Sequence, residues 1–339
     1  MREIGSEFWS APTTDKKSRF LPEHTQWYLS GRSALQAIIQ ELKHYHTVAM
    51  PSWCCDSMIK PFVDAGMKIV FYPVYWDDGL KQDIRLDCDI LFLMDYFGYG
   101  GSQPDLTRYH GVIIRDVTHT ALSSIRTDAD YYFGSLRKWC GVWTGGFAWA
   151  ENGCALSAGK TADKEYIILR EKAMRLKEAY ISAASCIDGH FTADKNFLDI
   201  FHKAEEHLDD IGIASAAERD VKVAEKLDIK YIQQCRRNNA ALLMEAFPQL
   251  LVFRKTEQAD CPLFVPILVP NGSRDKLRKY LIQKEIYCPI HWPISIYHRL
   301  NAQTEKIYAE ELSLICDQRY SEDDMIRMID AIKVFWKGV

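Results

Sequence analysis

The feature that most constrains the fold is a series of short apolar segments between residues 28 and 150, separated by loops or by helix-length stretches. Several of these segments have no polar face, so we expect both of their faces to be buried. Six segments are predicted to be strands: 48–53, 68–74, 89–97, 112–117, 130–135 and 145–150. Continuous apolar strands that alternate with helices predict a mostly parallel sheet with helices on both faces, which is a three-layer α/β/α architecture.

The rest of the chain predicts long helices and then a second, smaller unit. The first helix follows the small residues Ser30 and Gly31, and helices are expected over 32–43, 160–184 and 213–247. The alternation then resumes, with predicted strands at 250–254 and 264–269 and predicted helices at 273–284 and 321–336. We therefore expect a large α/β domain over residues 1–246 and a small C-terminal α+β domain over residues 247–339.

The charge balance and the apolar pattern exclude several classes of protein. The chain has 42 Lys and Arg against 46 Asp and Glu, so it lacks the basic field that holds a nucleic-acid backbone. No apolar stretch approaches the roughly 18 residues of a membrane-spanning helix. The polar N-terminal residues 1–17 have no apolar signal-peptide core. We expect a cytoplasmic protein that binds neither nucleic acid nor membrane.

The ten cysteines are scattered along the chain. They form no CxxC pair, and no Cys/His cluster has the spacing of zinc ligands. Without a signal peptide, this pattern is typical of reduced thiols that pack as small core residues. The sequence therefore predicts neither a disulfide framework nor a metal site.

Three segments carry residues that could bind a ligand or take part in catalysis. SGRSAL at 30–35 opens a helix with small residues, and unpaired N–H groups at a helix start can hold a phosphate. Asp116 ends a predicted strand, at the edge of an open α/β sheet where ligands bind, and His119 follows it. Lys138 follows the predicted strand 130–135, where a lysine in a cleft could form a Schiff base.

Each of these features alone has an ordinary structural explanation: a helix cap, a salt-bridged aspartate, a core histidine or a surface lysine. Their order along the chain is more specific than any one of them. A phosphate site, a carboxylate for a pyridine nitrogen and an amine for an aldehyde are what pyridoxal 5'-phosphate requires from a protein. The sequence therefore predicts this cofactor.

Six motifs together resemble the DegT/DnrJ/EryC1/StrS sugar aminotransferases, which are fold type I pyridoxal-phosphate enzymes. They are SGRSAL, VAMPSW, DYFGYG, RDVTHT, SLRK and the C-terminal LSLICDQRYSEDDMIRMIDAI, and the resemblance spans residues 26–337. It implies a homodimeric enzyme that transfers an amino group from an amino-acid donor such as glutamate to a nucleotide-linked keto sugar. It also implies a role in polysaccharide or secondary-metabolite biosynthesis.

The resemblance implies roles for individual residues. Lys138 would bind the cofactor aldehyde and move a proton at the substrate carbon. Asp116 would keep the pyridine nitrogen protonated, and His119 stands where the family usually has Gln, near the phenolic oxygen. Arg32 and Ser33 stand at the phosphate position, where Arg32 would add a charge-assisted contact.

The chain departs from the family pattern at three places. Phe133 stands where the family has a phosphate-binding serine, which leaves Ser135 as the nearest candidate. Cys55 stands where the family has an aromatic residue that stacks on the cofactor ring, so Trp53 is the alternative. The Asn-Tyr-Arg segment that reaches the phosphate from the partner subunit is not recognisable around 210–219.

These departures keep two other functions open. The first is a ligand-binding or regulatory protein that has the pyridoxal-phosphate fold but no turnover. The second is a pyridoxal-phosphate-dependent sugar dehydratase, against which Lys138 argues because that branch of the family has His in its place.

Two further segments have competing interpretations. The segment YCPIHWP at 287–293 is predicted either to line the substrate entrance or to pack in the core. Arg236 and Arg237 are most simply interpreted as part of a solvated helix face, and the alternative is a phosphate contact that crosses to the partner subunit.

Overall fold

The computed structural model describes residues 3–84, 87–101, 104–125, 127–185 and 194–338. Its central feature is a seven-stranded sheet in the order β2-β10-β9-β8-β7-β3-β4. The strands are β2 (Gln26–Tyr28), β3 (Thr47–Pro51), β4 (Lys68–Tyr72), β7 (Ile90–Met94), β8 (Val112–Asp116), β9 (Tyr131–Ser135) and β10 (Gly146–Ala150). Strands β9, β8, β7, β3 and β4 run parallel, whereas β10 is antiparallel to both β9 and β2. The predicted mostly parallel sheet is confirmed.

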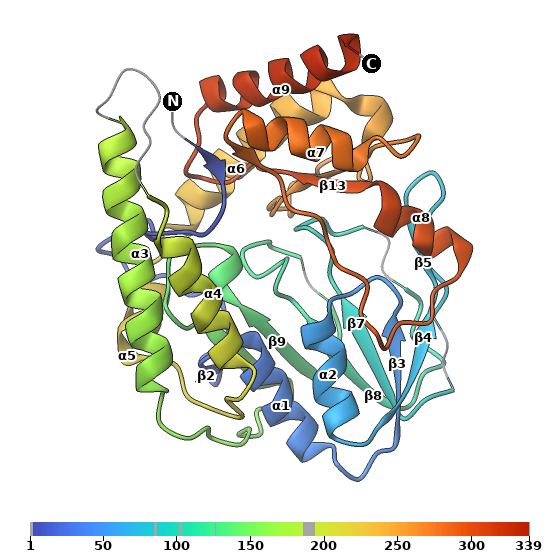
Figure 1. The fold of residues 1–339 in the computed structure, drawn as a ribbon. Helices are drawn as coiled ribbons and strands as arrows, with labels where there is room; N and C mark the ends of the chain where they lie inside the picture. The colour runs from blue at the N-terminus through green and yellow to red at the C-terminus, as the bar shows by residue number, and fades with distance from the viewer. Residues whose placement is uncertain (1–2, 85–86, 102–103, 126, 186–193, 339) are drawn as a thin grey trace.

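The helices of the described residues are α1 (Gly31–Glu41), α2 (Asp56–Asp64), α3 (Lys164–Ser185), α4 (Phe197–Leu208), α5 (Glu218–Ala224), α6 (Ile229–Ala246), α7 (Arg274–Gln283), α8 (Ala302–Glu310) and α9 (Glu322–Lys337). Helix α1 begins where predicted because the Ser30 hydroxyl accepts a hydrogen bond from the backbone N–H of Ser33. Its apolar face buries Leu35, Ile38 and Ile39. Figure 1 shows α1 and α2 on one face of the sheet.

The two faces of the sheet belong to two separate apolar cores, because successive side chains of a strand point to opposite sides. Phe133 and Ala148 face the core that contains α1 and α2. Tyr132 and Phe147 face the opposite core, which α5 and the start of α6 complete with residues such as Ile232. The sheet is thus covered on both faces, and the three-layer prediction is confirmed.

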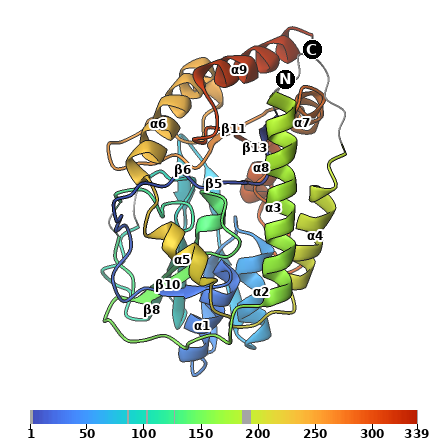
Figure 2. The same ribbon diagram turned by 90° about the vertical axis from the view of Figure 1, so that its left-hand side faces the viewer.

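Helices α3 and α4 pack side by side along one flank of the molecule, as Figures 1 and 2 both show. Helix α3 matches the helix predicted over 160–184. The prediction of continuous helix over 213–247 is wrong, since α5 and α6 are separate. The chain turns between them, and the Asp228 side chain starts α6 by accepting a hydrogen bond from the N–H of Tyr231.

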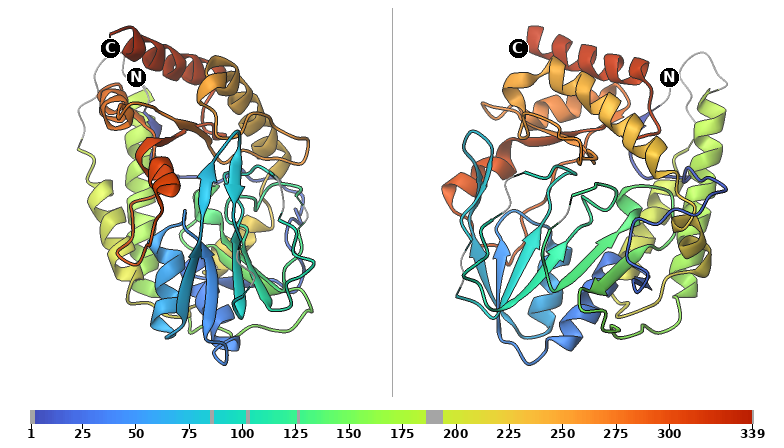
Figure 3. Two further views of the ribbon diagram at one scale, coloured as in Figure 1. Left: turned by 90° about the vertical axis from the view of Figure 1, so that its right-hand side faces the viewer. Right: turned by 180° about the vertical axis from the view of Figure 1, so that it is seen from behind.

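The C-terminal part of the chain lies over one end of the sheet, as the orange and red ribbon of Figure 3 shows. In it β11 (Val265–Leu268) pairs with β13 (Glu311–Leu314) in antiparallel fashion, beside α7, α8 and α9. The strand predicted over 250–254 is wrong. A 3-10 turn at Pro248–Leu250 occupies its start, and Leu251 makes only an isolated bridge to Ile267.

The apolar core of this C-terminal part also includes residues from outside it. Ile4 belongs to β1 (Ile4–Gly5), which pairs in parallel with β12 (Ile286–Tyr287). Ala240 and Leu243 enter the same core from α6. The domain boundary at residue 247 stays a prediction, because apolar contacts join the two sides of it.

Membrane-spanning helices, disulfides and metal sites can each be checked in the described residues. None of their helices combines the length and the low polarity that a bilayer crossing requires. Nine cysteines are free thiols, and Cys186 lies outside the described residues. Within the same ranges, no three acidic, His or Cys side chains lie together as metal ligands would.

Candidate active site

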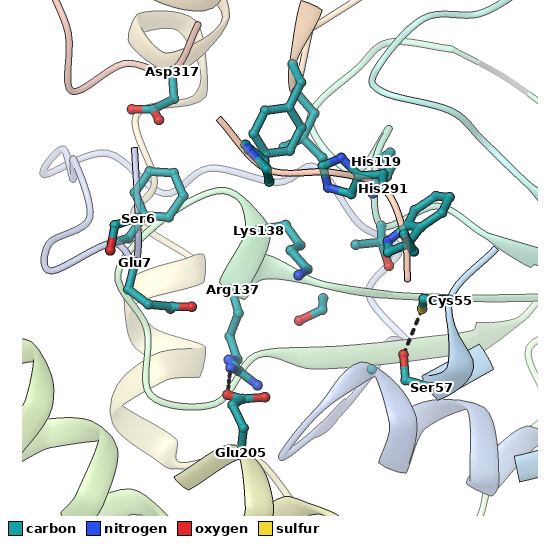
Figure 4. Close-up of a pocket in the computed structure, with 18 of the residues that line it drawn as sticks. Ser6, Glu7, Cys55, Ser57, His119, Arg137, Lys138, Glu205, His291 and Asp317 are labelled. Atoms are coloured by element: carbon teal, nitrogen blue, oxygen red, sulfur yellow. Dashed lines mark hydrogen bonds and ion pairs between the residues drawn. The ribbon is translucent and has the colours of Figure 1, made fainter. Parts of the chain in front are cut away.

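A cavity of about 660 Å³ opens at the carboxyl ends of β8 and β9, beneath the C-terminal part of the chain (Figure 4). Its wall comes from the N-terminal segment, the sheet edge, α4 and the segment after β12. Six of the eight predicted site residues line it: Arg32, Cys55, Asp116, His119, Ser135 and Lys138. Ser33 and Trp53 do not.

Lys138 ends a short 3-10 helix that directly follows β9. The preceding turn is fixed by the fully buried Leu136, whose N–H donates to the Gly145 carbonyl at 2.9 Å. The following residue, Trp139, is also fully buried and donates its indole N–H to the Thr118 carbonyl at 2.6 Å. These anchors on both sides leave the Lys138 side chain exposed to the cavity, as Figure 4 shows.

Asp116 is the last residue of β8, and only 1% of it is exposed. Burial raises the pKa of this carboxyl group to about 7, although the hydrogen bond from the Thr118 N–H at 2.7 Å and the charge of Lys138 act in the opposite direction. A buried carboxyl group in the cavity wall is suited to pair with a protonated pyridine nitrogen. The role of Asp116 stays a prediction.

His119 is held in a defined tautomer. Its Nδ1 accepts a hydrogen bond from the backbone N–H of Phe97 at 3.1 Å, so the ring hydrogen must lie on Nε2. Burial holds the pKa of His119 well below its usual value, and the charges of His291 and Lys138 act in the same direction. The ring is therefore neutral, and its Nε2–H is the hydrogen that can be donated to a ligand.

The start of α1 forms one end of the cavity, where Ser30, Gly31 and Arg32 lie with Ser135. A Cβ atom on Gly31 would lie 3.4 Å from the Cβ of Ser135, so glycine keeps the space between α1 and β9 open. Backbone N–H groups at a helix start, together with two hydroxyl groups, are the donors that a phosphate needs.

Two arginines extend this end of the cavity. Arg32 pairs with Asp209 and Arg137 pairs with Glu205, so both carboxylates come from the last turn of α4 or directly after it. The Nε–H groups of both arginines are nevertheless buried without a hydrogen-bond partner among the described residues. Buried unpaired donors are costly, and an anion in the cavity would satisfy them. The residues present therefore fit a phosphate group.

Ser33 and Trp53 are used inside the protein instead. Ser33 is fully buried, and its hydroxyl donates to the Gly212 carbonyl at 2.9 Å. Trp53 is also fully buried; it stacks on Tyr96 with ring centroids 5.0 Å apart and donates its indole N–H to the His291 carbonyl at 2.7 Å. Neither side chain reaches the cavity, because both have partners in the core.

Cys55 does line the cavity at the start of α2, where its sulfur lies 2.9 Å from the Ser57 hydroxyl. Burial raises the pKa of this thiol, so it stays protonated at neutral pH. Among the aromatic side chains that line the cavity, Trp292 lies nearly parallel to His119, with ring centroids 5.8 Å apart. Of the two interpretations of 287–293, the structure thus favours the one that lines the cavity.

Sequence reasoning missed the contribution of the N-terminal segment. Glu7 lines the cavity opposite Lys138, with 40% of its side chain exposed. Burial raises the pKa of its carboxyl group, but Arg170, Arg137, Lys138 and Lys177 together hold it at about 2. Glu7 is therefore an ionised carboxylate in a cationic setting. No local motif marks it, because its neighbours come from distant parts of the chain.

The interpretation of Arg236 as part of a solvated face is wrong. This residue is fully buried and lines the cavity, and its guanidinium donates to the Gln318 side chain and the Leu263 carbonyl, both at 2.9 Å. Its position in α6 could have shown this. Arg236 is four residues from the buried Ile232 and four from the buried Ala240, so it lies on the apolar stripe of the helix. Arg237 is partly buried and donates to backbone carbonyls.

Comparisons with known proteins identify the fold. No protein-family model matches the chain, and no curated protein matches it. Among solved structures, PseC of Helicobacter pylori, an aminotransferase involved in the biosynthesis of pseudoaminic acid, superposes with a TM-score of 0.63 at 14% identity over 98% of this chain and 100% of its own. A DegT DnrJ EryC1 StrS aminotransferase of Brucella abortus gives 0.60 at 16% identity over 92% and 86%. The aminotransferase TlmJ of Streptoalloteichus hindustanus gives 0.61 at 14% identity over 93% and 86%.

These likenesses span nearly the whole chain, so they include both the sheet and the C-terminal part that covers the cavity. Their low sequence identity limits them to the fold. The chain has the fold of the DegT/DnrJ/EryC1/StrS sugar aminotransferases, which is that of the fold type I pyridoxal-phosphate enzymes.

Proposed function

We propose that the protein is a pyridoxal-phosphate-dependent aminotransferase that moves an amino group from an amino acid, glutamate being the first candidate, to a nucleotide-linked keto sugar. The observation that carries this proposal is that one cavity joins Lys138, the buried Asp116 and the anion-binding end of α1. These are the amine, the carboxylate and the phosphate site that the cofactor requires.

The residues that would hold the cofactor follow from the donors of the cavity. Ser30, the backbone at Gly31 and Arg32, Ser135 and Arg137 would hold its phosphate. Asp116 would pair with the pyridine nitrogen. His119 would donate its Nε2–H to the phenolic oxygen, because its Nδ1 is already occupied.

When bound, pyridoxal phosphate supplies an electron sink for the bonds of the amino carbon. Lys138 would bind the aldehyde covalently and, once displaced by the donor amine, would take the proton from the amino carbon and return it to the cofactor. Asp116 is buried, so its charge acts across a medium of low dielectric and keeps the paired nitrogen protonated. The C-terminal part of the chain, by covering the cavity, limits the access of water.

We further propose that the enzyme acts in the cytoplasm as a homodimer, in the biosynthesis of polysaccharides or secondary metabolites. The biosynthetic role named for PseC and the shared fold support this context. Light scattering of the purified protein measures its oligomeric state, and a monomer that is active would contradict the homodimer.

The test of the reaction is the visible absorption spectrum of the protein with added pyridoxal phosphate, before and after glutamate. We expect the band of lysine-bound cofactor, and we expect glutamate to convert it to the band of pyridoxamine phosphate. Lys138→Ala should abolish the first band, whereas Lys172→Ala, which changes an exposed lysine of α3, should retain it. A bound cofactor that does not respond to any amino acid would favour the ligand-binding alternative.

A further inference from the structure

His291 lines the cavity and belongs to the segment between β12 and α8. Its ring packs between aromatic side chains, with centroids 5.2 Å from Phe97 and 4.9 Å from Phe264. The ring of His119 lies 6.0 Å away. The proposed roles of Lys138, Asp116 and His119 leave His291 without a function, although it faces the same cavity.

A continuous set of hydrogen bonds joins His291 to a buried carboxylate. His291 Nδ1 lies 2.8 Å from the hydroxyl oxygen of Ser313, and that hydroxyl donates to Glu311 Oε1 at 2.5 Å. The other oxygen, Glu311 Oε2, accepts the backbone N–H of His291 at 2.7 Å. Glu311 and Ser313 are both fully buried and lie two residues apart in β13, so their side chains share one face of the strand.

These bonds define the tautomer of His291. Because the hydrogen of Ser313 points to the carboxylate, the Ser313 oxygen must accept a hydrogen from His291 Nδ1. The Nε2 atom of His291 then carries a lone pair and no hydrogen. His119 has the opposite arrangement, with Nδ1 as acceptor and Nε2 as donor. The two rings therefore bring one base and one hydrogen-bond donor to the same cavity.

The proposed reaction needs such a base. An amino donor carries an ammonium group at neutral pH, and this group must lose a proton before its nitrogen can attack the lysine-bound cofactor. The Cys55 thiol is already protonated, and Glu7, with a pKa of about 2, is a weak base. His119 is not available as a base, because the lone pair of its Nδ1 already accepts a hydrogen bond from the backbone N–H of Phe97.

We propose that His291 is the general base that takes this proton, with Ser313 and Glu311 as its positioning residues. The inference rests on the aminotransferase proposed above. One N–H bond of the ammonium group breaks and one Nε2–H bond forms on His291, which becomes an imidazolium. Its Nδ1–H continues to donate to Ser313, and the Glu311 carboxylate stabilises the new charge through the serine hydroxyl. The Glu311 carboxylate lies 3.9 Å from His291 Nδ1, and the neutral ring of His119 lies 6.0 Å from the His291 ring.

The kinetic test is the single-turnover reaction of the cofactor-loaded protein with glutamate. General bases contribute about 10²- to 10⁴-fold, so His291→Gln should slow this step by at least about 10²-fold. In His291→Gly, added imidazole should restore part of the rate, since it replaces the base but not a structural contact. The matched control is His298→Gln, because His298 is equally buried, at 7% exposure, but does not line the cavity.

The spectroscopic test is the imidazole nitrogen NMR spectrum of the unliganded protein with ¹⁵N-labelled histidine, where His291 is assigned from the signal that His291→Gln removes. We expect the hydrogen on Nδ1 in the wild type and expect Ser313→Ala to abolish this preference. A hydrogen on Nε2 would overturn the inference without any measurement of turnover. If the wild type is active and His291→Gln reacts equally fast, the inference is overturned as well. If the wild type binds the cofactor but does not react with any amino acid, the proposed function itself is overturned, and the role of His291 as its base with it.

Discussion

The guanidinium of Arg115 donates to the carboxylate of Asp95 at 2.7 Å, and both side chains are buried. Asp95 directly follows β7, and Arg115 is the residue before Asp116 in the neighbouring strand β8. Asp95 also accepts the Thr120 hydroxyl at 2.5 Å, which fixes the chain between Asp116 and Lys138. An ion pair at the ends of β7 and β8 thus also holds Thr120, in the segment that follows Asp116.

Breaking this pair should destabilise the protein strongly. Asp95→Asn leaves the charge of Arg115 buried without its carboxylate, and loss of one member of a buried pair costs about 3–5 kcal/mol. Urea denaturation of the unliganded protein measures this change. Asp64→Asn is the control, because it removes only the solvent-exposed partner of Lys60 and should change the stability little. Equal losses in the two variants would contradict the structural role of Asp95.

Asp116 should make the stability of the unliganded protein depend on pH. Burial raises its pKa from 3.8 to about 7, so between these values the folded state binds more protons than the unfolded state. The stability that this group contributes is therefore lost as pH rises from about 4 to 7. Melting temperatures of wild type and Asp116→Asn should diverge in favour of the variant as pH rises through this window. If the two melting temperatures differ by the same amount across this pH range, the carboxyl group ionises in the folded protein as it does in the unfolded chain.

Arg137 should contribute to binding of the cofactor phosphate. Its buried Nε–H has no partner in the part of the chain that the structure describes, and a hydrogen bond to a charged group is worth about 1.5–3 kcal/mol. Arg137→Gln should therefore weaken pyridoxal phosphate binding by roughly 10- to 100-fold. The affinity for pyridoxal, which has no phosphate, should change little, and fluorescence titration measures both. Arg175→Gln, which changes an exposed arginine of α3, is the control.

Gly146 should be intolerant of a side chain. A Cβ atom at this position in β10 would lie 2.0 Å from the Ser30 carbonyl oxygen and 2.9 Å from the Gly31 nitrogen. Gly146→Ala must therefore push the start of α1 away from the sheet, which costs about 1–3 kcal/mol and disturbs the phosphate end of the cavity. Thermal unfolding and pyridoxal phosphate titration should both show a loss. Gly212→Ala, where no atom lies within 4 Å of the new Cβ, should retain wild-type behaviour.

The sequence predicted the features that depend on neighbouring residues. Continuous apolar runs identified the six long strands of the sheet, and Ser30 marked the start of α1 through its own cap. The same local reasoning placed Asp116 at the end of a strand and Lys138 after one, and parallel strands bring their carboxyl ends to one edge. It failed where a turn interrupts a helical pattern near Asp228, and where residues 250–254 lack a strand partner beyond Leu251.

Only the tertiary structure decided which side chains the cavity contains. Trp53 and Ser33 lie in suitable segments, but packing partners hold both away from the cavity. Glu7 lines the cavity without a local signal, and the tautomer of His291 follows from Ser313 and Glu311, because the groups that hold both residues come from distant parts of the chain. Secondary structure follows from hydrogen bonds and apolar periodicity over a few residues, whereas burial, charge and tautomer depend on contacts that exist only once the chain has folded.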